Sequence, residues 1–238
     1  KTPLKTIIGF ASLIPSLELA GETDSLLDFI GHLEQSASHL NYLVERILEL
    51  FRLEAGRIPV RLGSYAVQEI VEGSLQELKG TIMGRAIDRD LDEAADASIL
   101  CDARLFTRAL ELVLENAVKF SPADKSIAIS ASRHRTPPDV PEYAGGLEKL
   151  LARGDGNGWV GIVIHDHGKG MKERDIPRIF EKFKQLGDIM TDKPAGIGLG
   201  LSIARAIMER HHGALWADLD PEGGTRLHFL LPAAKTET

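Results

Sequence analysis

Apolar residues recur three and four positions apart through the first 53 residues, and this period predicts two helices. The first helix begins at Pro3, a residue suited to a first helical turn, and runs to about Leu19, although Pro15 should bend it or end it early. Residues 20–23 read as the turn between the helices. The second helix carries an unbroken a/d pattern for nearly four heptads, made of Leu26, Ile30, Leu33, Ala37, Leu40, Val44, Ile47 and Phe51.

Such a long apolar seam has to be covered. One hairpin cannot bury the seam together with the flanking Leu27, Leu43 and Leu50, whereas two hairpins can do so as a four-helix bundle. We therefore expect a homodimer that forms through residues 1–53. The alternative is a hairpin that packs on the downstream part of its own chain.

The pattern changes after Gly56, which suits a helix C-cap, and Pro59 cannot continue a helix, so residues 57–64 are predicted to be a linker. Further along, helices are predicted at 65–79 and 103–120, with Asp102 as the N-cap of the second. Strands are predicted at 86–91, 98–101, 127–132, 159–165, 214–219 and 225–231, the last two as a hairpin. This order favours an α+β domain over 65–234, with a mixed sheet and helices on one face.

Residues 133–158 interrupt this order with several prolines and glycines, which predicts a solvated insertion in which 147–153 is a candidate short helix. The 238 residues are 43% apolar, enough for a real core and for more than one domain. A net charge of −7 does not favour a nucleic-acid partner. The single cysteine, Cys101, rules out a disulfide framework and fits a reducing compartment. No apolar run nears the roughly 20 residues that cross a bilayer, but the chain starts without methionine, so upstream membrane segments stay open.

The segment 196–201 reads GIGLGL, with glycines at alternate positions. They let the backbone approach a ligand, and a helix that starts at 199–202 would direct free N–H groups at an anion, most plausibly a phosphate. A flexible loop that opens a core helix is the alternative. A dinucleotide fingerprint is disfavoured, because Leu201 replaces its last glycine and no apolar strand precedes it. Residues 184–195 read as a mobile loop.

Two further patterns carry candidate chemistry. Asn116 and Lys119 lie three apart on the 103–120 helix, where an amide oxygen can ligate Mg²⁺ and an ammonium can neutralise phosphate, although an ordinary surface pair is equally open. Asp166 ends a buried strand before Gly168 and Gly170, which suits a flat ring with an exocyclic amine such as adenine, against the alternative of a simple turn. His165 and His167 fall on the opposite face from Asp166 and predict no metal site.

Three smaller features complete the pattern. Phe180 and Phe183 are candidates to anchor the 184–195 loop on the core. The pair at 211–212 is read as histidines that interact with the dipole at a helix C-terminus. Residues 223–225 form a tight turn that presents the Thr225 hydroxyl to the sheet.

The order of these motifs is more informative than any one of them. Asn-Ala-x-Lys-Phe, Asp-x-Gly-x-Gly, Phe-Glu-Lys-Phe, Gly-x-Gly-Leu-Gly-Leu and Gly-Gly-Thr follow one another along the chain. This order resembles the catalytic domain of sensor histidine kinases, within the group that includes gyrase, mismatch-repair and heat-shock ATPases. The opening Lys-Thr-Pro-Leu resembles the end of the kinases' His-Glu-Leu-Lys-Thr-Pro-Leu box. The resemblance covers nearly the whole chain outside 133–158.

The resemblance implies a dimerisation and phosphotransfer hairpin over 1–56, which forms a dimeric four-helix bundle, followed by a two-layer Bergerat-type sandwich that binds ATP and Mg²⁺. Asn116 would hold Mg²⁺, Lys119 would contact phosphate and Asp166 would bind the adenine amine, while the glycine run would let a lid fold over the triphosphate. The implied ATP site consists of Asn116, Lys119, Phe120, Asp166, Gly168, Gly170, Gly196, Gly198, Leu199, Gly200, Leu201 and Thr225.

The implied reaction passes the γ-phosphoryl of ATP to a histidine and then to an aspartate on a response-regulator receiver domain. By the motif, the acceptor histidine lies three positions before Lys1 and is absent from this chain. Thr2 would orient a water that dephosphorylates the regulator. The resemblance implies a cytoplasmic module, or the cytoplasmic part of a membrane-bound sensor.

The chain also departs from the family at Leu112, where the kinases carry a second Asn and the related ATPases a water-activating Glu. This disfavours simple ATP hydrolysis, and with it an ATPase clamp. It also keeps open a degenerate kinase that acts as a dimeric signalling scaffold or phosphatase.

Overall fold

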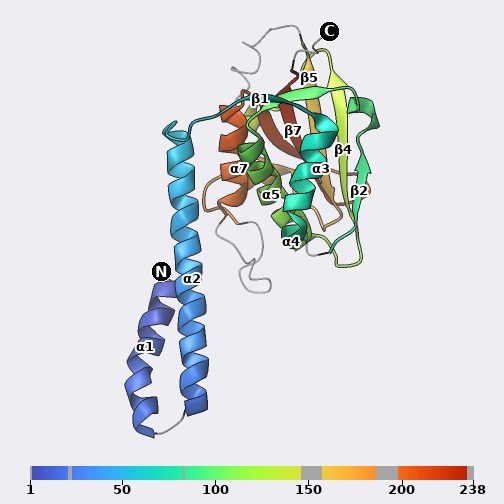
Figure 1. The fold of residues 1–238 in the computed structure, drawn as a ribbon. Helices are drawn as coiled ribbons and strands as arrows, with labels where there is room; N and C mark the ends of the chain where they lie inside the picture. The colour runs from blue at the N-terminus through green and yellow to red at the C-terminus, as the bar shows by residue number, and fades with distance from the viewer. Residues whose placement is uncertain (1, 21–22, 83, 146–156, 186–197, 235–238) are drawn as a thin grey trace. The chain divides into compact units, whose positions relative to one another are not determined.

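The computed structural model describes residues 2–20, 23–82, 84–145, 157–185 and 198–234. The chain divides into two compact units, residues 1–51 and 52–238 (Figure 1). Among the described residues, no helix combines the length and the apolar character that a membrane span requires.

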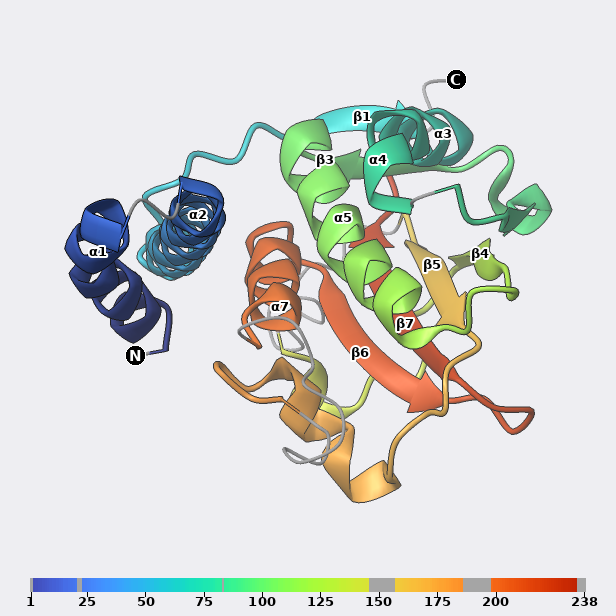
Figure 2. The same ribbon diagram turned by 90° about the horizontal axis from the view of Figure 1, so that it is seen from below.

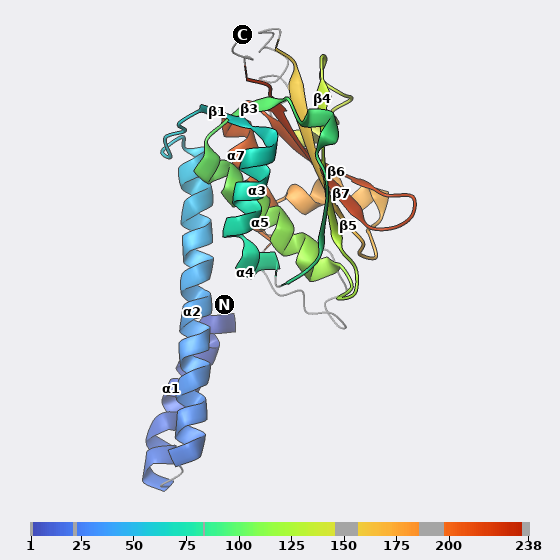
Figure 3. The ribbon, with the colours of Figure 1, turned by 45° about the vertical axis from the view of Figure 1, so that its right-hand side comes forward.

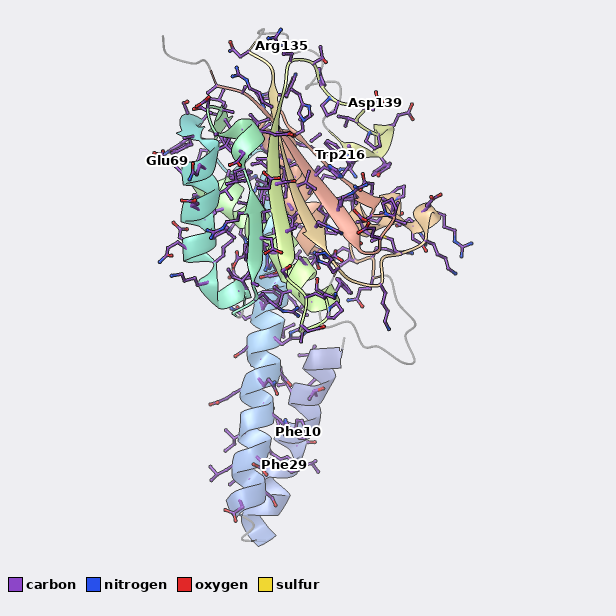
Figure 4. All side chains as sticks on the ribbon, turned by 90° about the vertical axis from the view of Figure 1, so that its right-hand side faces the viewer. Phe10, Phe29, Glu69, Arg135, Asp139 and Trp216 are labelled. Carbon is purple, nitrogen blue, oxygen red and sulfur yellow. The ribbon has the colours of Figure 1, made fainter. Side chains whose placement is uncertain are left out.

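The first unit is a helical hairpin of α1 (Thr2–Ala20) and most of α2 (Thr23–Glu54). Phe10 of α1 packs between the helices against Phe29 and His32 of α2, with ring centroids 5.0 and 5.4 Å apart (Figure 4). We expected the first helix to bend or end early at Pro15. The structure has no helix boundary there, because α1 continues through Pro15 to Ala20. A proline removes only one N–H from the helical ladder, and the turns on both sides still form.

The second unit is built on a five-stranded sheet in the order β2-β4-β5-β7-β6. Its strands are β2 (Ile87–Asp90), β4 (Ile127–His134), β5 (Trp159–Asp166), β7 (Thr225–Pro232) and β6 (Ala214–Leu219). The pair β2–β4 is parallel and the other neighbours are antiparallel, so the sheet is mixed, as the sequence predicts.

Three helices cover one face of this sheet and make a two-layer α/β sandwich (Figure 3). They are α3 (Val67–Glu77), α5 (Ala103–Phe120) and α7 (Gly200–Arg210). In the view of Figure 2, α5 and α7 lie side by side, and the two helices pack against each other. Their apolar faces and the inward positions of the strands form the core, in which the rings of Phe106 and Phe229 meet edge to face at 6.0 Å.

The helix predicted at 65–79 is shorter than expected. Tyr65 and Ala66 belong to β1 (Gly63–Ala66), which pairs antiparallel with β3 (Ser98–Cys101) outside the main sheet. Tyr65 lies opposite Ile99 in this pair, and an aromatic residue opposite a β-branched one stabilises a strand pairing. The helix ends at Glu77 and is followed by a single turn, α4 (Lys79–Ile82).

Short 3-10 turns connect the remaining elements, and they are η1 (Asp92–Ala94), η2 (Glu142–Ala144), η3 (Glu173–Asp175) and η4 (Pro177–Phe180). The described part of the 133–158 insertion is not simply solvated, so that expectation is wrong there. Ala144 is fully buried with Trp159 and Trp216, and the Tyr143 hydroxyl donates to the Ala217 carbonyl at 2.6 Å. The segment therefore covers the edge strand β6, which would otherwise expose its backbone groups. The candidate helix at 147–153 lies outside the described residues.

Candidate functional site

The last turns of α5 carry the first part of the site. The helix begins as predicted, because the Asp102 side chain accepts a hydrogen bond from the Leu105 N–H at 3.1 Å. Its strongly apolar face is buried, so Asn116 is left half-buried at the rim. The Asn116 amide donates through Nδ2 to the Leu112 carbonyl at 3.1 Å. Among the described residues its Oδ1 has no hydrogen-bond donor, and it can serve as a ligand.

The N-terminus of α7 lies next to this amide. A Cβ built on Gly200 would be 3.8 Å from Nδ2 of Asn116 and 3.7 Å from Cδ2 of Leu112. The N–H groups of the first turn of a helix have no partner within the helix, so this end of α7 offers donors to an anion. The fold thus brings Gly200 and Asn116 together, although they are far apart in sequence. Gly196 and the 186–197 part of the predicted loop lie outside the described residues.

Asp166 ends β5 and is only 6% exposed. Its Oδ1 accepts hydrogen bonds from the N–H groups of Gly168 at 2.8 Å and Thr225 at 3.3 Å. Burial raises the pKa of this carboxyl above its ordinary value, and the two hydrogen bonds and the nearby histidines oppose that rise only in part. Within the described residues Oδ2 has no hydrogen-bond partner, so one oxygen is left for a ligand's donor.

A glycine is required where the hairpin between β6 and β7 meets Asp166. Gly224 has φ +95°, and a Cβ on it would lie 1.9 Å from the Asp166 carbonyl oxygen. On the other side, a Cβ on Gly168 would lie 2.8 Å from the Phe120 carbonyl oxygen, so the loop after Asp166 sits against the end of α5. Gly170, with φ +64°, borders the same hairpin. The close approaches bring three separate motifs to one place.

His165 and His167 flank Asp166 and make contacts around the loop that follows it. The His167 N–H donates to Oγ of Ser121 at 3.2 Å, and its Nδ1 lies 2.9 Å from the Ser126 carbonyl oxygen. The His165 ring lies 4.5 Å from that of His167. His167 therefore contacts the loop between α5 and β4, whereas Nε2 of His165 lies 3.2 Å from the Gly223 carbonyl oxygen of the β6–β7 hairpin. The described part of the chain has no group of three or more metal-binding side chains.

Lys119 and Phe120 end α5 and are both exposed. The Lys119 ammonium lies 4.8 Å from the centroid of the Phe120 ring, and partial burial lowers its pKa. Lys119 also lines a cavity of about 530 Å³ formed with residues 84–86, 118 and 123–126, which does not include Asn116 or Asp166.

The sequence analysis missed one residue that supports this end of the site. Arg85 donates through Nη2 to the carbonyl oxygens of Val118 and Ser121 at 3.1 and 3.0 Å. A guanidinium that binds the last carbonyls of a helix stabilises that end and complements its dipole. Because the contact spans more than 30 residues of sequence, no local pattern indicates it.

The remaining predicted residues differ in burial and surroundings. Phe180 is buried, but Phe183 is 58% exposed, so only the first of these aromatics belongs to the core. Leu199 is buried beneath the start of α7, Leu201 is half-buried, and Gly198 has φ +70°. His211 does not act as a cation at the end of α7, because burial lowers its pKa and its ring is hydrogen-bonded in the neutral form. Thr2 belongs to the other unit.

The single oxygen ligand that Asn116 offers suits a Mg²⁺ ion that is also bound by substrate phosphates. It does not suit a metal ion held by protein ligands alone. Asn116 offers one neutral oxygen, and the described residue one turn earlier, Leu112, is 1% exposed and apolar. Mg²⁺ commonly keeps waters and binds few protein ligands together with substrate phosphates.

Comparison with known proteins identifies the family of the second unit. Residues 101–235 match the family model described as histidine kinase-, DNA gyrase B-, and HSP90-like ATPase. The chain therefore belongs to this ATPase family, and the predicted resemblance to sensor histidine kinases is confirmed.

The relatives and solved structures extend beyond that domain. The chain is 25% identical over 239 residues to the non-motile and phage-resistance protein of Caulobacter vibrioides, covering 100% of this chain and 26% of that protein. It is 25% identical to the sensor histidine kinase GacS of Pseudomonas protegens, covering 99% of this chain and 24% of that protein. The chain thus spans about a quarter of the length of these relatives. The crystal structure of full-length ShkA in complex with AMPPNP matches the fold with a TM-score of 0.65 at 23% identity, covering 100% of this chain and 44% of that one.

Proposed function

We propose that this chain is the transmitter core of a sensor histidine kinase, which binds Mg-ATP in its second unit and passes the γ-phosphoryl to a histidine outside these 238 residues. The observation that carries the proposal is the convergence of Asn116, the α7 N-terminus at Gly200 and the buried Asp166 in one fold of this ATPase family. The AMPPNP complex of ShkA, a protein of the same fold, supports nucleotide binding.

We assign each residue a part in nucleotide binding. Oδ2 of Asp166 accepts a hydrogen bond from the exocyclic amine of adenine. The N–H groups of Gly168 and Thr225 donate to Oδ1 and hold the carboxyl group in place. Asn116 would hold Mg²⁺ through Oδ1, because its Nδ2 is already bonded to the Leu112 carbonyl, and Lys119, three residues further along α5, would contact the phosphates. Bound Mg²⁺ would neutralise charge that develops on the phosphate oxygens. Glycines at 196, 198 and 200 allow the backbone to approach the triphosphate.

The transfer itself needs positioning more than covalent chemistry from this unit. The bond between the γ-phosphorus and the bridging oxygen breaks, ADP leaves, and a bond forms from phosphorus to an imidazole nitrogen. The phosphoryl then passes to an aspartate of a response-regulator receiver domain. Because Leu112 occupies the place of a water-activating carboxylate, transfer to water is disfavoured. In the longer protein, Thr2 would assist dephosphorylation of the regulator.

A homodimer through residues 1–53 is part of the proposal. In the described hairpin, several seam residues stay uncovered: Val44 is 45% exposed, Phe51 60% and the flanking Leu27 62%. Apolar side chains at heptad spacing are covered when two hairpins associate as a four-helix bundle. The relatives that are sensor kinases support this arrangement in general.

The first test uses the parent protein with its upstream residues and ATP labelled on the γ-phosphate. Protein-bound label that survives base and is lost in acid indicates phosphohistidine and supports the kinase. In parallel, Asn116→Ala should abolish Mg-ATP binding by this chain, and unchanged affinity would refute the site. If nucleotide binds and no label appears, the second candidate gains support: a degenerate kinase that acts as a scaffold or phosphatase, as the apolar Leu112 favours.

A further inference from the structure

The segment that follows α2 belongs to the second unit, and three contacts attach it to the rest of that unit. Gly56, with φ +66°, ends the helix, and its N–H donates to the Leu53 carbonyl at 3.0 Å. Each of the three attachments joins a residue of 54–61 to a residue far along the chain. The pairs are Glu54 with Lys182, Ile58 with Arg210, and Arg61 with Asp102.

Two of these attachments reach the helices that frame the site, at the ends opposite to it. The Arg61 N–H donates to Oδ2 of Asp102, the N-cap of α5, at 2.8 Å. Arg210, the last residue of α7, donates to the Ile58 carbonyl at 3.3 Å. Asn116 lies near the other end of α5, so these contacts fix the scaffold and do not touch the site.

The third attachment is different, because it reaches residues 181–185, which are hydrogen-bonded to Gly198 next to the start of α7. Nζ of Lys182 lies 2.7 and 2.8 Å from the two carboxylate oxygens of Glu54, the last residue of α2. We call residues 181–185 and 198–199 the stem. The Phe183 N–H donates to the Gly198 carbonyl at 2.9 Å and closes the stem. Gly200, which contacts Asn116, follows two residues after Gly198.

The stem holds a conformation that needs support. Phe183 has φ +61°, which is unfavourable for a residue with a side chain, and that side chain is 58% exposed. A Cβ on Gly198 would lie 2.2 Å from the Lys184 carbonyl oxygen, so the two segments of the stem, 181–185 and 198–199, are in close contact. A relaxation at Phe183 would therefore displace Gly198 and, with it, the first turn of α7.

We propose that the Glu54–Lys182 ion pair positions the stem for nucleotide binding, so that Lys182 is a positioning residue that links the end of α2 to the phosphate side of the site. This inference rests on the proposed function. α2 belongs to both units, so a change at its last turn reaches the stem through this pair. By linkage, bound nucleotide strengthens the pair by the same factor by which the pair strengthens nucleotide binding.

The test is a charge-swap cycle on the full 238-residue chain at low salt: Glu54→Lys, Lys182→Glu and both together. Calorimetry measures the Kd for Mg-AMPPNP. Because both side chains are partly exposed, we expect each single variant to raise Kd about two- to fivefold and the double variant to return it near the wild-type value. Glu34→Lys and Lys172→Glu, exposed residues outside the stem, are the matched controls and should leave Kd unchanged.

A second readout does not need the nucleotide. Hydrogen exchange at the Phe183 amide should be faster in both single variants and return to the wild-type rate in the double variant. The inference is overturned if the single variants match the wild type in both measurements, or if the double variant is as impaired as the single ones. If the wild-type chain binds no nucleotide, the proposed function fails, while the exchange cycle still decides whether the pair holds the stem.

Discussion

Replacing Asp166 by Asn separates the proposed adenine contact from the stability of the fold. The two side chains have nearly the same shape, so the Asn oxygen can still accept from the N–H groups of Gly168 and Thr225. The other terminal atom then changes from an acceptor to an NH₂ donor. It would face the exocyclic amine of adenine, which is also a donor, and the contact would become repulsive.

The expected loss follows from the kind of hydrogen bond that is removed. A bond to a charged group contributes about 1.5–3 kcal/mol, and a buried group left without its partner adds to the loss. We therefore expect Asp166→Asn to weaken Mg-ATP binding by about 10- to 150-fold. Guanine carries an oxygen in place of the amine, so the affinity for Mg-GTP should stay constant or rise.

The same substitution should not destabilise the protein. Burial raises the pKa of Asp166 above its ordinary value of 3.8, so the folded state holds a proton at a pH where the unfolded chain has lost it. Stability from this group is present at low pH and is lost as pH rises through the folded pKa. At neutral pH the charged form costs free energy that the neutral Asn does not, and we expect an equal or higher Tm.

Calorimetry with ATP and GTP, together with thermal unfolding at pH 7, checks both halves of this prediction. Asp96→Asn, an exposed carboxylate on the surface, is the control and should change neither value. If Asp166→Asn binds ATP within about twofold of the wild type, Asp166 does not contact the base and the reasoning is wrong. If the Tm falls together with the affinity, a structural role explains the result instead.

Four other predictions follow from single contacts. Because burial lowers the pKa of His211 below its ordinary 6.5, the wild type should lose free energy of unfolding as pH falls below about 6.5, and urea unfolding of His211→Gln should lack that component. Gly224→Ala should lower the free energy of unfolding by about 2–4 kcal/mol in the same assay. Gly223 has φ +109° and no atom within 4 Å of a built Cβ, so Gly223→Ala should lower it by only about 1 kcal/mol, through backbone strain. Equal losses would contradict the clash of a Gly224 Cβ with Asp166. Arg85→Ala should lower stability by about 1–2 kcal/mol and speed amide exchange in the last turn of α5, and unchanged exchange there would count against its capping role. Phe51→Glu should shift the chain from dimer to monomer in sedimentation, and a monomeric wild type would contradict the proposed bundle.

The sequence pattern was enough to predict the helices and strands that are determined by residues close together in the chain. The helix at 103–120 and its cap at Asp102 were predicted to the residue, because an N-cap side chain and an apolar stripe act within a few positions. The strands of the main sheet were also predicted, because their apolar and polar residues alternate, or form short apolar runs, next to recognisable turn residues. The order of the motifs was sufficient to indicate the family.

Pairings across the chain were not predictable in the same way. Tyr65 and Ala66 were assigned to a helix, because only the partner strand at 98–101 makes them a strand. Tyr143 lies in a proline- and glycine-rich segment that reads as solvated, yet it covers the edge of β6. The carbonyl contacts of Arg85 and the ion pair of Lys182 join segments separated by many residues, and a periodic pattern carries no information about them.

The arrangement of α5 and α7 explains how one unit can be rigid and still hold a responsive site. At one end, Asp102 and His211 lock the helices together, since the Asp102 N–H donates to Nε2 of a fully buried, neutral imidazole at 2.9 Å. At the other end, Asn116 meets Gly200, which has no side chain and directly follows Leu199 of the stem. In the proposed site, a displacement of the stem would therefore change the phosphate side without repacking the core. Asp166 rests on the sheet instead, so the base contact should be unaffected while the phosphate contacts respond to α2.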